Sequence, residues 1–183
     1  MPLLSVCIPT YNQPESVALL LGSLCDQYHS EVEIVVCDDS SDDETKHVVD
    51  SFLPHLPIRY IRRSREGLDS AVIELVRVAT GDYVWWIGDD MLLPDAISKV
   101  CDLLTDNRDL IFLWLNSCDI TNSNLLTINK TSTSIFNNRN FLLRYDIGLL
   151  GFITATMFRR DVALRCLDDA KRHIGSAFAC LYI

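Results

Sequence analysis

The stretch of sequence that decides the fold is YVWWIGDDMLLPD, residues 83–95. It opens with five apolar residues, all β-branched or aromatic, which is typical of a strand buried on both faces in a parallel sheet. The apolar run stops at Asp89 and Asp90, so this acidic pair follows the carboxyl end of the strand. Ligands of open α/β sheets bind in the crevice outside that edge. The stretch therefore predicts both an α/β fold and the place of its site.

The acidic pair has a chemical consequence of its own. Two adjacent carboxylates repel each other, and a hard divalent cation with oxygen ligands relieves that repulsion. We therefore predict a Mn²⁺ or Mg²⁺ site at Asp89 and Asp90, with a phosphate as a further ligand. The alternative is that the pair only caps a helix beginning near Pro94, since Asp is a common turn and N-cap residue. Adjacent strand residues point to opposite faces, so one ion reaches both carboxylates only where the backbone has turned.

Length and composition predict one globular domain over residues 1–183. With 49% hydrophobic residues, the chain can build a substantial core. The net charge of −9 disfavours nucleic acid or an anionic membrane as the main partner, because both are bound through clustered Lys and Arg. Seven cysteines without a Cys-x-x-Cys spacing indicate reduced thiols that fill the core, and not a zinc site.

The sequence carries no signal for a membrane span. Its apolar runs are too short for a transmembrane helix, and Met1-Pro2-Leu3-Leu4 lacks the charged start of a signal peptide. We expect a cytoplasmic protein, with peripheral attachment to the inner membrane face as an open alternative.

Strand and helix patterns alternate through the first half of the chain. Short loops join them, which indicates a mostly parallel sheet with helices on both faces, a Rossmann-type α/β fold. The third helix is expected to end at Gly81 as its C-cap. The strands are expected at residues 4–8, 32–37 and 58–61, and the helices at residues 14–27, 44–53 and 68–79.

Polar side chains follow each of these strands at the point where it ends. Because parallel strands end at one edge, four loops should converge on one crevice. A carboxylate for base or ribose, an aromatic ring for stacking and a cation for phosphates would together hold a nucleoside diphosphate. The residues are Thr10, Tyr11 and Asn12, then Asp38 and Asp39, then Arg62, Arg63 and Arg65, and finally Asp89 and Asp90.

Several motifs resemble those of the GT-A-fold glycosyltransferases of family 2. They are SVCIPTYN at residues 5–12, EIVVCDDSSD at 33–42, and ATGDY at 79–83 leading to the acidic pair and to Pro94-Asp95. The resemblance covers residues 1–105. Within the family, the residues at 66–69 and 85–90 look most like the branch of abequosyltransferase-like enzymes of surface polysaccharide assembly.

The resemblance implies inverting transfer of a sugar from a nucleotide-sugar donor to a saccharide or lipid-linked acceptor. It implies that Asp89 and Asp90 hold Mn²⁺ or Mg²⁺ at the donor diphosphate, where the ion acts as a Lewis acid. The residues that it assigns to nucleotide binding are Pro9, Thr10, Tyr11, Asn12, Glu15, Asp38, Asp39, Arg65, Asp69 and Asp89.

The chain departs from the family pattern at two places. Val72 and Ile73 stand where the family usually has an Arg-Asn pair, so the donor-site arginine is missing or comes from elsewhere. Many relatives carry a third carboxylate where this chain has Gly88 or Met91. The acidic pair would therefore hold its cation with one protein carboxylate fewer than in those relatives.

Residues 106–183 form a partial acceptor half in this interpretation, after a nucleotide-sugar-binding half at 1–105. Strands are expected at 110–115 and 152–158, a helix at 161–170, and a polar acceptor loop at 121–140. An inverting transferase needs a general base near the acceptor hydroxyl. No catalytic residue stands out, and Asp119, Asp146 and His173 are open candidates.

The last ten residues, 174–183, are mostly apolar. We expect them to pair the chain in a homo-oligomer or to pack against further residues of a longer protein. A catalytically incomplete nucleotide-sugar-binding module is therefore one alternative function. A sugar nucleotidyltransferase is another, although Pro9-Thr10-Tyr11-Asn12 stands where a Gly-rich phosphate loop would be expected.

Overall fold

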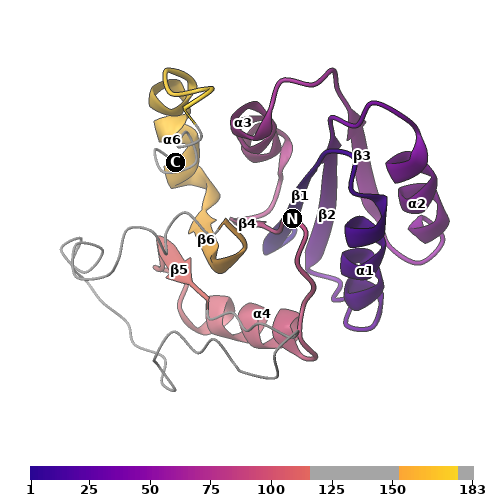
Figure 1. Ribbon diagram of the computed structural model, residues 1–183. Coiled ribbons are helices and arrows are strands. Elements are labelled where there is room, and N and C mark those ends of the chain that lie inside the picture. Colours follow the sequence, from indigo (N-terminus) through magenta and orange to yellow (C-terminus); the bar gives the residue numbers. More distant parts are fainter. Residues whose placement is uncertain (116–152, 177–183) are drawn as a thin grey trace, which may run out of the picture.

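The computed structural model describes residues 1–115 and 153–176, and these residues build one six-stranded sheet with helices on both faces (Figure 1). The strand order is β3-β2-β1-β4-β6-β5. The strands are β1 (Leu4–Thr10), β2 (Val32–Asp38), β3 (Ile58–Arg62), β4 (Tyr83–Trp86), β5 (Phe112–Trp114) and β6 (Thr156–Arg159). The helices are α1 (Pro14–Cys25), α2 (Glu44–Phe52), α3 (Leu68–Val78), α4 (Ala96–Asp106) and α6 (Arg160–Lys171).

Strands β1 to β4 form the parallel part of the sheet. β1 lies between β2 and β4, and its whole length pairs with β2, from Leu4↔Val32 to Thr10↔Asp38. β6 pairs antiparallel with both β4 and β5. The expected mostly parallel, Rossmann-type α/β fold is confirmed.

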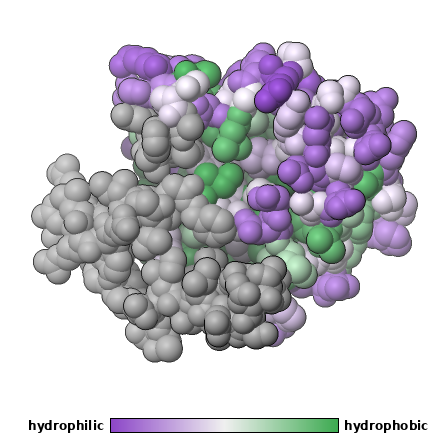
Figure 2. Space-filling model, viewed as in Figure 1, coloured by the Kyte–Doolittle hydropathy of each residue, from purple (hydrophilic) through white to green (hydrophobic). Residues whose placement is uncertain are grey.

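Two apolar layers hold the sheet between the helices. Helices α1, α2 and α4 cover one face, and α3 and α6 cover the other. β4 is buried on both faces, as expected, with Trp85 in the first layer and Trp86 in the second. The apolar face expected for α1 is also confirmed, since Val17, Leu20, Leu21 and Leu24 are all buried. Figure 2 shows mostly hydrophilic residues over the outer surface of α2.

β1 runs two residues past its expected end at Ile8, through Pro9 to Thr10. Proline has no N–H to donate to a neighbouring strand. Pairing of β1 with β4 ends at Cys7↔Trp86, and the Ile87 N–H donates to the Cys7 carbonyl at 3.0 Å. Pro9 therefore lies where only β2 still pairs with β1, and the missing donor interrupts nothing.

Two other expected details are wrong. Residues 153–155 form a 3₁₀ turn, η2 (Ile153–Ala155), so the strand expected over 152–158 begins only at Thr156. Gly81 is not the C-cap of α3, because the helix ends at Val78 and its C-cap is Ala79. A Cβ on Gly81 would lie 2.7 Å from Ser5 Oγ and 2.9 Å from the Leu4 carbonyl carbon. Glycine at 81 thus permits a close approach to β1.

The cysteines of the described residues are free thiols on the expected elements. Cys7 and Cys37 are buried on neighbouring strands, and Cys101 is buried on α4. Burial raises the pKa of Cys37, and likewise that of Cys101, to about 11, so both stay protonated at neutral pH. Among the described helices, none has the length and apolar character needed to cross a bilayer.

Candidate functional site

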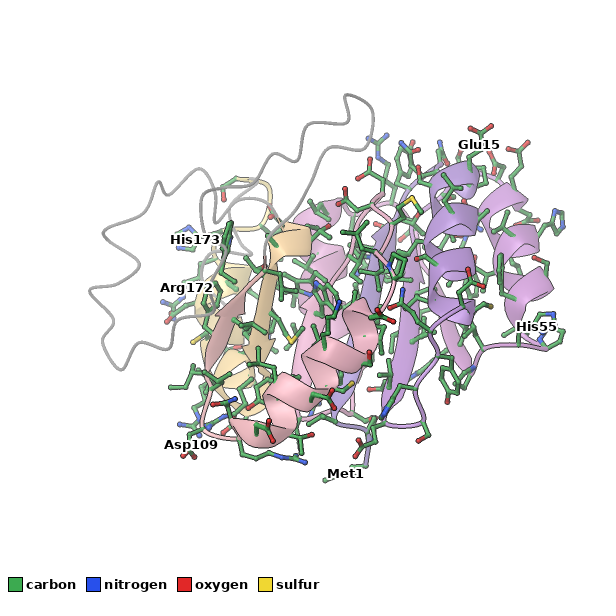
Figure 3. The ribbon with its side chains drawn as sticks, turned by 90° about the horizontal axis from the view of Figure 1, so that it is seen from below. Met1, Glu15, His55, Asp109, Arg172 and His173 are labelled. Atoms are coloured by element: carbon green, nitrogen blue, oxygen red, sulfur yellow. The ribbon has the colours of Figure 1, made fainter. Side chains whose placement is uncertain are left out.

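The carboxyl ends of β1, β2 and β3 meet at one edge of the sheet, which we call the carboxyl edge. The Asp39 N–H donates to the Thr10 carbonyl at 3.0 Å, and the Arg63 N–H donates to the Asp38 carbonyl at 2.9 Å. Figure 3 shows Glu15, near the start of α1, at the opposite end of the molecule from Met1 and Asp109. The convergence of these loops is therefore real, and backbone hydrogen bonds hold it.

Asp38 is the most enclosed of the expected site residues. Its side chain is fully buried, and its Oδ1 accepts the Ser40 N–H at 2.8 Å. Its Oδ2 accepts the Tyr60 hydroxyl at 2.6 Å and an Arg62 N–H at 3.2 Å. Burial, together with this hydrogen bond to Asp38, raises the pKa of Tyr60 to about 12. The carboxylate of Asp38 thus organises the loop around it and has no face open to a ligand.

Asp39 has a different environment although it is also buried. Its Oδ2 accepts the Glu66 N–H at 3.1 Å. Its Oδ1 lies 3.3 Å from Arg63 Nε as an ion pair but accepts no aligned hydrogen bond among the described residues. The buried Thr10 Oγ1, at the end of the adjoining strand, is also without a hydrogen bond there. Buried polar atoms are rarely left in this state, so both are candidates to bind a ligand.

Asn12 joins the first loop to the second. Its φ of 52° lies in the left-handed region, which Asn adopts more readily than most residues. Its N–H donates to Ser40 Oγ at 2.8 Å, and its Oδ1 accepts the Ser41 N–H at 2.9 Å. The role of Asn12 in this structure is to fix the loop that carries Tyr11.

Tyr11 and Arg65 form an exposed stack above this edge. The Arg65 guanidinium lies 4.2 Å from the centroid of the Tyr11 ring, and its Nη1 donates to the Tyr11 hydroxyl at 3.0 Å. Tyr11 is 37% exposed, so its ring is accessible for stacking. The stack brings Arg65, from the loop after β3, next to the loop after β1.

The acidic pair lies in an irregular turn, Gly88–Asp90, which we call the acidic turn. Asp90 is half-buried, and its Oδ2 accepts the Thr154 hydroxyl at 2.6 Å. Asp89 is exposed, and within residues 1–115 and 153–176 no hydrogen bond or ion pair engages its carboxylate. β4 ends at Trp86, so the backbone has left the regular strand before the pair. The two carboxylates are therefore not forced to opposite faces of a strand, a condition that must hold for both to bind one ion.

The capping interpretation of the acidic pair is wrong. Helix α4 begins at Ala96, and its N-cap residue is Asp95, which has a φ of 63° and makes no side-chain cap. No three His, Cys, Asp or Glu side chains of the described residues form a group that could hold a metal by themselves. One or two carboxylates completed by phosphate oxygens and water are a usual Mg²⁺ ligand set, so the acidic turn fits a cation shared with a diphosphate.

The other residues expected at the site have different positions and contacts in the structure. Pro9 is in β1, and Glu15 is exposed in the first turn of α1. Asp69 is buried, and its Oδ2 accepts the Gly175 N–H at 2.8 Å, so it ties α3 to the segment after α6. Asp119 and Asp146 lie outside the described residues, as does most of the apolar segment 174–183. Val72 and Ile73 are buried in the core against the sheet.

Three residues of this edge were missed by the sequence interpretation. Ser40 and Tyr60 bind the loop residues Asn12 and Asp38, and Thr154 binds the acidic turn. A hydroxyl in a turn or strand is too common to single out. Only the spatial pairing reveals these contacts.

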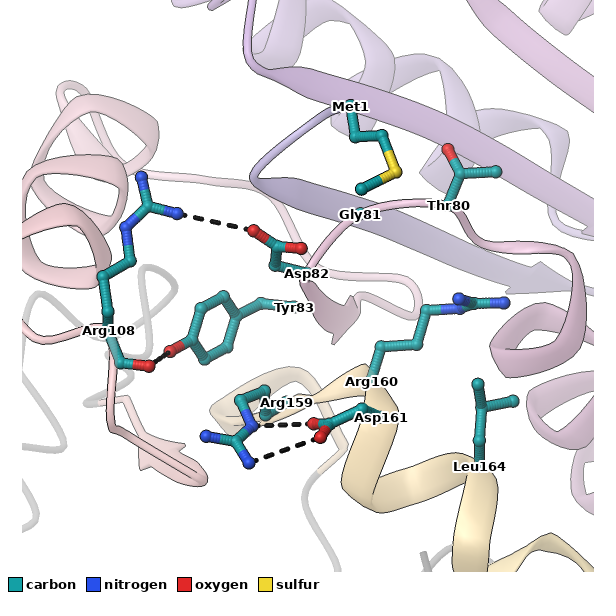
Figure 4. Close-up of a pocket in the computed structure, with 10 residues that line it drawn as sticks. All are labelled: Met1, Thr80, Gly81, Asp82, Tyr83, Arg108, Arg159, Arg160, Asp161 and Leu164. Atoms are coloured by element: carbon teal, nitrogen blue, oxygen red, sulfur yellow. Dashed lines mark hydrogen bonds and ion pairs between the residues drawn. The ribbon is translucent and has the colours of Figure 1, made fainter.

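Two cavities lie away from the acidic turn. One, of about 320 Å³, is at the opposite edge of the sheet, where Arg108 and Arg159 are paired with Asp82 and Asp161 (Figure 4). Another, of about 460 Å³, lies between α3 and α6 and is bordered by Arg63. The third arginine of the first cavity, Arg160, donates to the Val76 and Arg77 carbonyls, so its guanidinium is engaged by the backbone, and we assign this cavity no ligand.

Comparison with known proteins gives a consistent result. The family model described as glycosyl transferase family 2 matches residues 5–167. The chain is 35% identical over 202 residues to abequosyltransferase RfbV of Salmonella typhimurium, covering 99% of the chain and 60% of that protein. It is 28% identical over 138 residues to chondroitin synthase of Escherichia coli, covering 74% of the chain and 20% of that protein. The chain thus spans less than two thirds of these relatives.

Solved structures share the fold. TarS 1-349 of S. aureus in complex with UDP superposes with a TM-score of 0.75 at 18% identity, covering 100% of this chain and 54% of that one. Mannosyltransferase PcManGT from Pyrobaculum calidifontis, in complex with GDP-Man and Mn²⁺, gives a TM-score of 0.55 at 27% identity. That match covers 64% of this chain and 35% of the other.

Proposed function

This chain belongs to glycosyl transferase family 2, and we propose that it transfers a sugar from a nucleoside diphosphate sugar to a saccharide or lipid-linked acceptor. One observation carries the proposal. Two buried oxygens without an aligned hydrogen bond among the described residues, Thr10 Oγ1 and Asp39 Oδ1, lie at the same sheet edge as the carboxylate of Asp89, which no described residue engages. A ligand that brings N–H or O–H donors at one end and a cation-bound diphosphate at the other would satisfy them all.

The nucleoside end of the donor is assigned to the loops after β1 and β2. Asp39 Oδ1 would accept a base N–H or a ribose hydroxyl, which would give this buried atom the hydrogen bond it lacks. The Tyr11 ring already carries the planar Arg65 guanidinium at 4.2 Å, so it can carry a base in a similar stack. Asp38 and Asn12 would act by holding these loops in place.

The diphosphate end is assigned to the acidic turn. Asp89 and Asp90 would hold a Mn²⁺ or Mg²⁺ ion, which as a Lewis acid neutralises charge on the departing nucleoside diphosphate. Their hard carboxylate oxygens match the ligand preference of these cations. A structural relative at 27% identity was solved with Mn²⁺ and a nucleotide sugar, which supports the same arrangement here.

The finer activity follows the resemblance to abequosyltransferase RfbV. We infer inverting transfer in surface polysaccharide biosynthesis, in a chain whose first 105 residues bind the donor and whose later residues contact the acceptor. We likewise expect a cytoplasmic enzyme, peripheral at the inner membrane face where the acceptor is lipid-linked. Self-association through residues 174–183 stays a prediction.

A nucleotide-sugar-binding module without transfer activity is the second candidate. It is favoured by the carboxylates described between residues 153 and 176, because each of them is ion-paired with an Arg or Lys of the same segment. None of these, namely Asp161, Asp168 and Asp169, is therefore poised as a general base.

Donor binding and turnover separate the two candidates. Melting temperatures and titration calorimetry with UDP, GDP, CDP and dTDP, each with and without Mn²⁺, should identify one nucleotide that stabilises the chain. A ligand at a hundred times its Kd stabilises by about 2.7 kcal/mol. The corresponding nucleotide sugars, supplied with saccharide and lipid-linked acceptors, then test transfer. Binding without transfer would favour the module, and the absence of binding by all four nucleotides would overturn the proposed function.

A further inference from the structure

The hydroxyl of Thr154 forms hydrogen bonds with both ends of the acidic turn. Thr154 Oγ1 accepts the Gly88 N–H at 3.2 Å and donates to Asp90 Oδ2 at 2.6 Å. Gly88 and Asp90 are thereby held to one oxygen atom, and Asp89 lies between them. The two neighbouring carboxylates consequently have different hydrogen bonding. One oxygen of Asp90 accepts the Thr154 hydroxyl, while the exposed carboxylate of Asp89 has no partner within the described residues.

Hydrogen bonds to backbone carbonyls hold the chain in place at Thr154. Its carbonyl accepts the indole N–H of Trp85 at 2.8 Å, which links η2 directly to β4. The carbonyl of the next residue, Ala155, accepts the Leu115 N–H at 2.7 Å. These bonds fix the backbone at Thr154, and the two bonds of its hydroxyl then hold the side chain against the acidic turn.

We infer that Thr154 is the positioning residue of the acidic turn and presets Asp89 and Asp90 for a cation-bound diphosphate. The inference rests on the proposed function. A hydrogen bond from a hydroxyl to a carboxylate is short and strong, and it removes one rotational freedom from Asp90. Without it, two like charges in adjacent positions would spread apart, and binding would have to order them again. Thr154 needs no contact with the ligand to have this effect.

The test compares Mn²⁺-dependent nucleotide binding by the unaltered chain, by Thr154→Val and by Thr154→Ser. Calorimetry with whichever of UDP, GDP, CDP and dTDP the unaltered chain binds, with and without Mn²⁺, gives the affinities, and the electron paramagnetic resonance of Mn²⁺ reports the ion directly. Thr154→Val keeps the branched shape but loses the hydroxyl, and it should weaken diphosphate binding in Mn²⁺ on the order of tenfold. Thr154→Ser keeps the hydroxyl and should restore most of the affinity.

Two controls separate positioning from a general loss of structure. Thr156→Val removes a neighbouring hydroxyl whose bond goes to the Ile153 carbonyl and not to the acidic turn, so its Mn²⁺-dependent affinity should match that of the unaltered chain. The nucleoside that corresponds to the bound diphosphate lacks phosphates, so Thr154→Val should not change its binding. If Thr154→Val fails to fold, Thr154→Ala provides the same comparison.

The outcomes distinguish the two proposals. If the unaltered chain binds none of UDP, GDP, CDP and dTDP in Mn²⁺, the proposed function fails, and this inference fails with it. If the unaltered chain binds one of them and the valine variant binds it equally well, only the inference fails. An equal loss of nucleoside and diphosphate binding in the valine variant would also contradict the inference, because it would indicate a structural defect.

Discussion

Replacing Asp39 by asparagine tests the nucleoside end of the site most sharply. The substitution keeps the size of the side chain and removes the negative charge from an oxygen that lacks an aligned hydrogen bond. A hydrogen bond to a charged group contributes about 1.5–3 kcal/mol and one between neutral groups about 0.5–1.5 kcal/mol, so the asparagine, which keeps the acceptor oxygen, should lose about 1–1.5 kcal/mol. Since each 1.4 kcal/mol is about tenfold in Kd, binding of the preferred nucleoside diphosphate should weaken about five- to tenfold.

The fold should survive this substitution. Arg63 would lose its ion pair with Asp39 but keep its bond to Glu66 Oε2 at 3.0 Å. The matched control is Asp43→Asn in the neighbouring turn, because that side chain is 71% exposed and lies 3.6 Å from Arg62. The control should bind nucleotide like the unaltered chain.

Calorimetry with the preferred nucleoside diphosphate and with the corresponding nucleoside measures the effect. In Asp39→Asn, the nucleoside and the diphosphate should lose affinity by the same factor, while the Mn²⁺ enhancement of diphosphate binding stays constant. Unchanged nucleoside affinity would refute the assignment of Asp39. So would a loss confined to the Mn²⁺-dependent part of binding.

Three further predictions follow from the described contacts. Replacing Asp89 and Asp90 together by asparagine should abolish the Mn²⁺ enhancement of nucleotide binding in calorimetry and leave nucleoside binding intact; a retained enhancement would refute the cation assignment. Gly81→Ala should lower the free energy of unfolding in urea by about 1–3 kcal/mol, because its Cβ would overlap β1. Gly22→Ala, inside α1 with nothing within 4 Å of the new Cβ, should instead raise it by about 0.5–1 kcal/mol. Finally, the raised pKa of Cys37, about 11, means that the unfolded chain loses this proton first. The contribution of the protonated Cys37 thiol to stability is complete below pH 9 and is lost as pH rises through 11. The free energy of unfolding in urea should therefore fall over that range, and it should fall less in Cys37→Ala.

The parallel half of the fold could be predicted because its signals are local. Five apolar residues from Tyr83 to Ile87 identify a doubly covered strand wherever they occur, and the spacing of Val17, Leu20, Leu21 and Leu24 identifies a buried helix face. The polar residues after each strand then converge by topology alone. This reasoning located Asp39 and Asp89 at one edge without any knowledge of their contacts.

The roles of individual side chains at that edge depend on contacts between distant residues. The Thr154 to Asp90 bond joins positions 64 residues apart, and no local pattern announces it. Asp38 and Asp39 look alike in sequence, yet only Asp39 retains an acceptor without an aligned hydrogen bond. The capping interpretation of the acidic pair failed for a related reason. Helix α4 begins at Ala96 and not near Pro94, and its N-cap is Asp95, in a left-handed conformation.

The central claim is that the carboxyl edge binds a nucleoside diphosphate, and nuclear magnetic resonance of the ¹⁵N-labelled chain tests it most directly. The chain is titrated with the diphosphate that stabilises it, in the presence of Mg²⁺, which does not broaden the signals. The amide signals of Thr10 to Asn12, Asp39 to Ser40 and Gly88 to Asp90 should shift together with one Kd. Signals of Arg108 and Arg159, at the opposite edge, should stay in place. Shifts confined to the opposite edge, or to the cavity between α3 and α6, would contradict the claim.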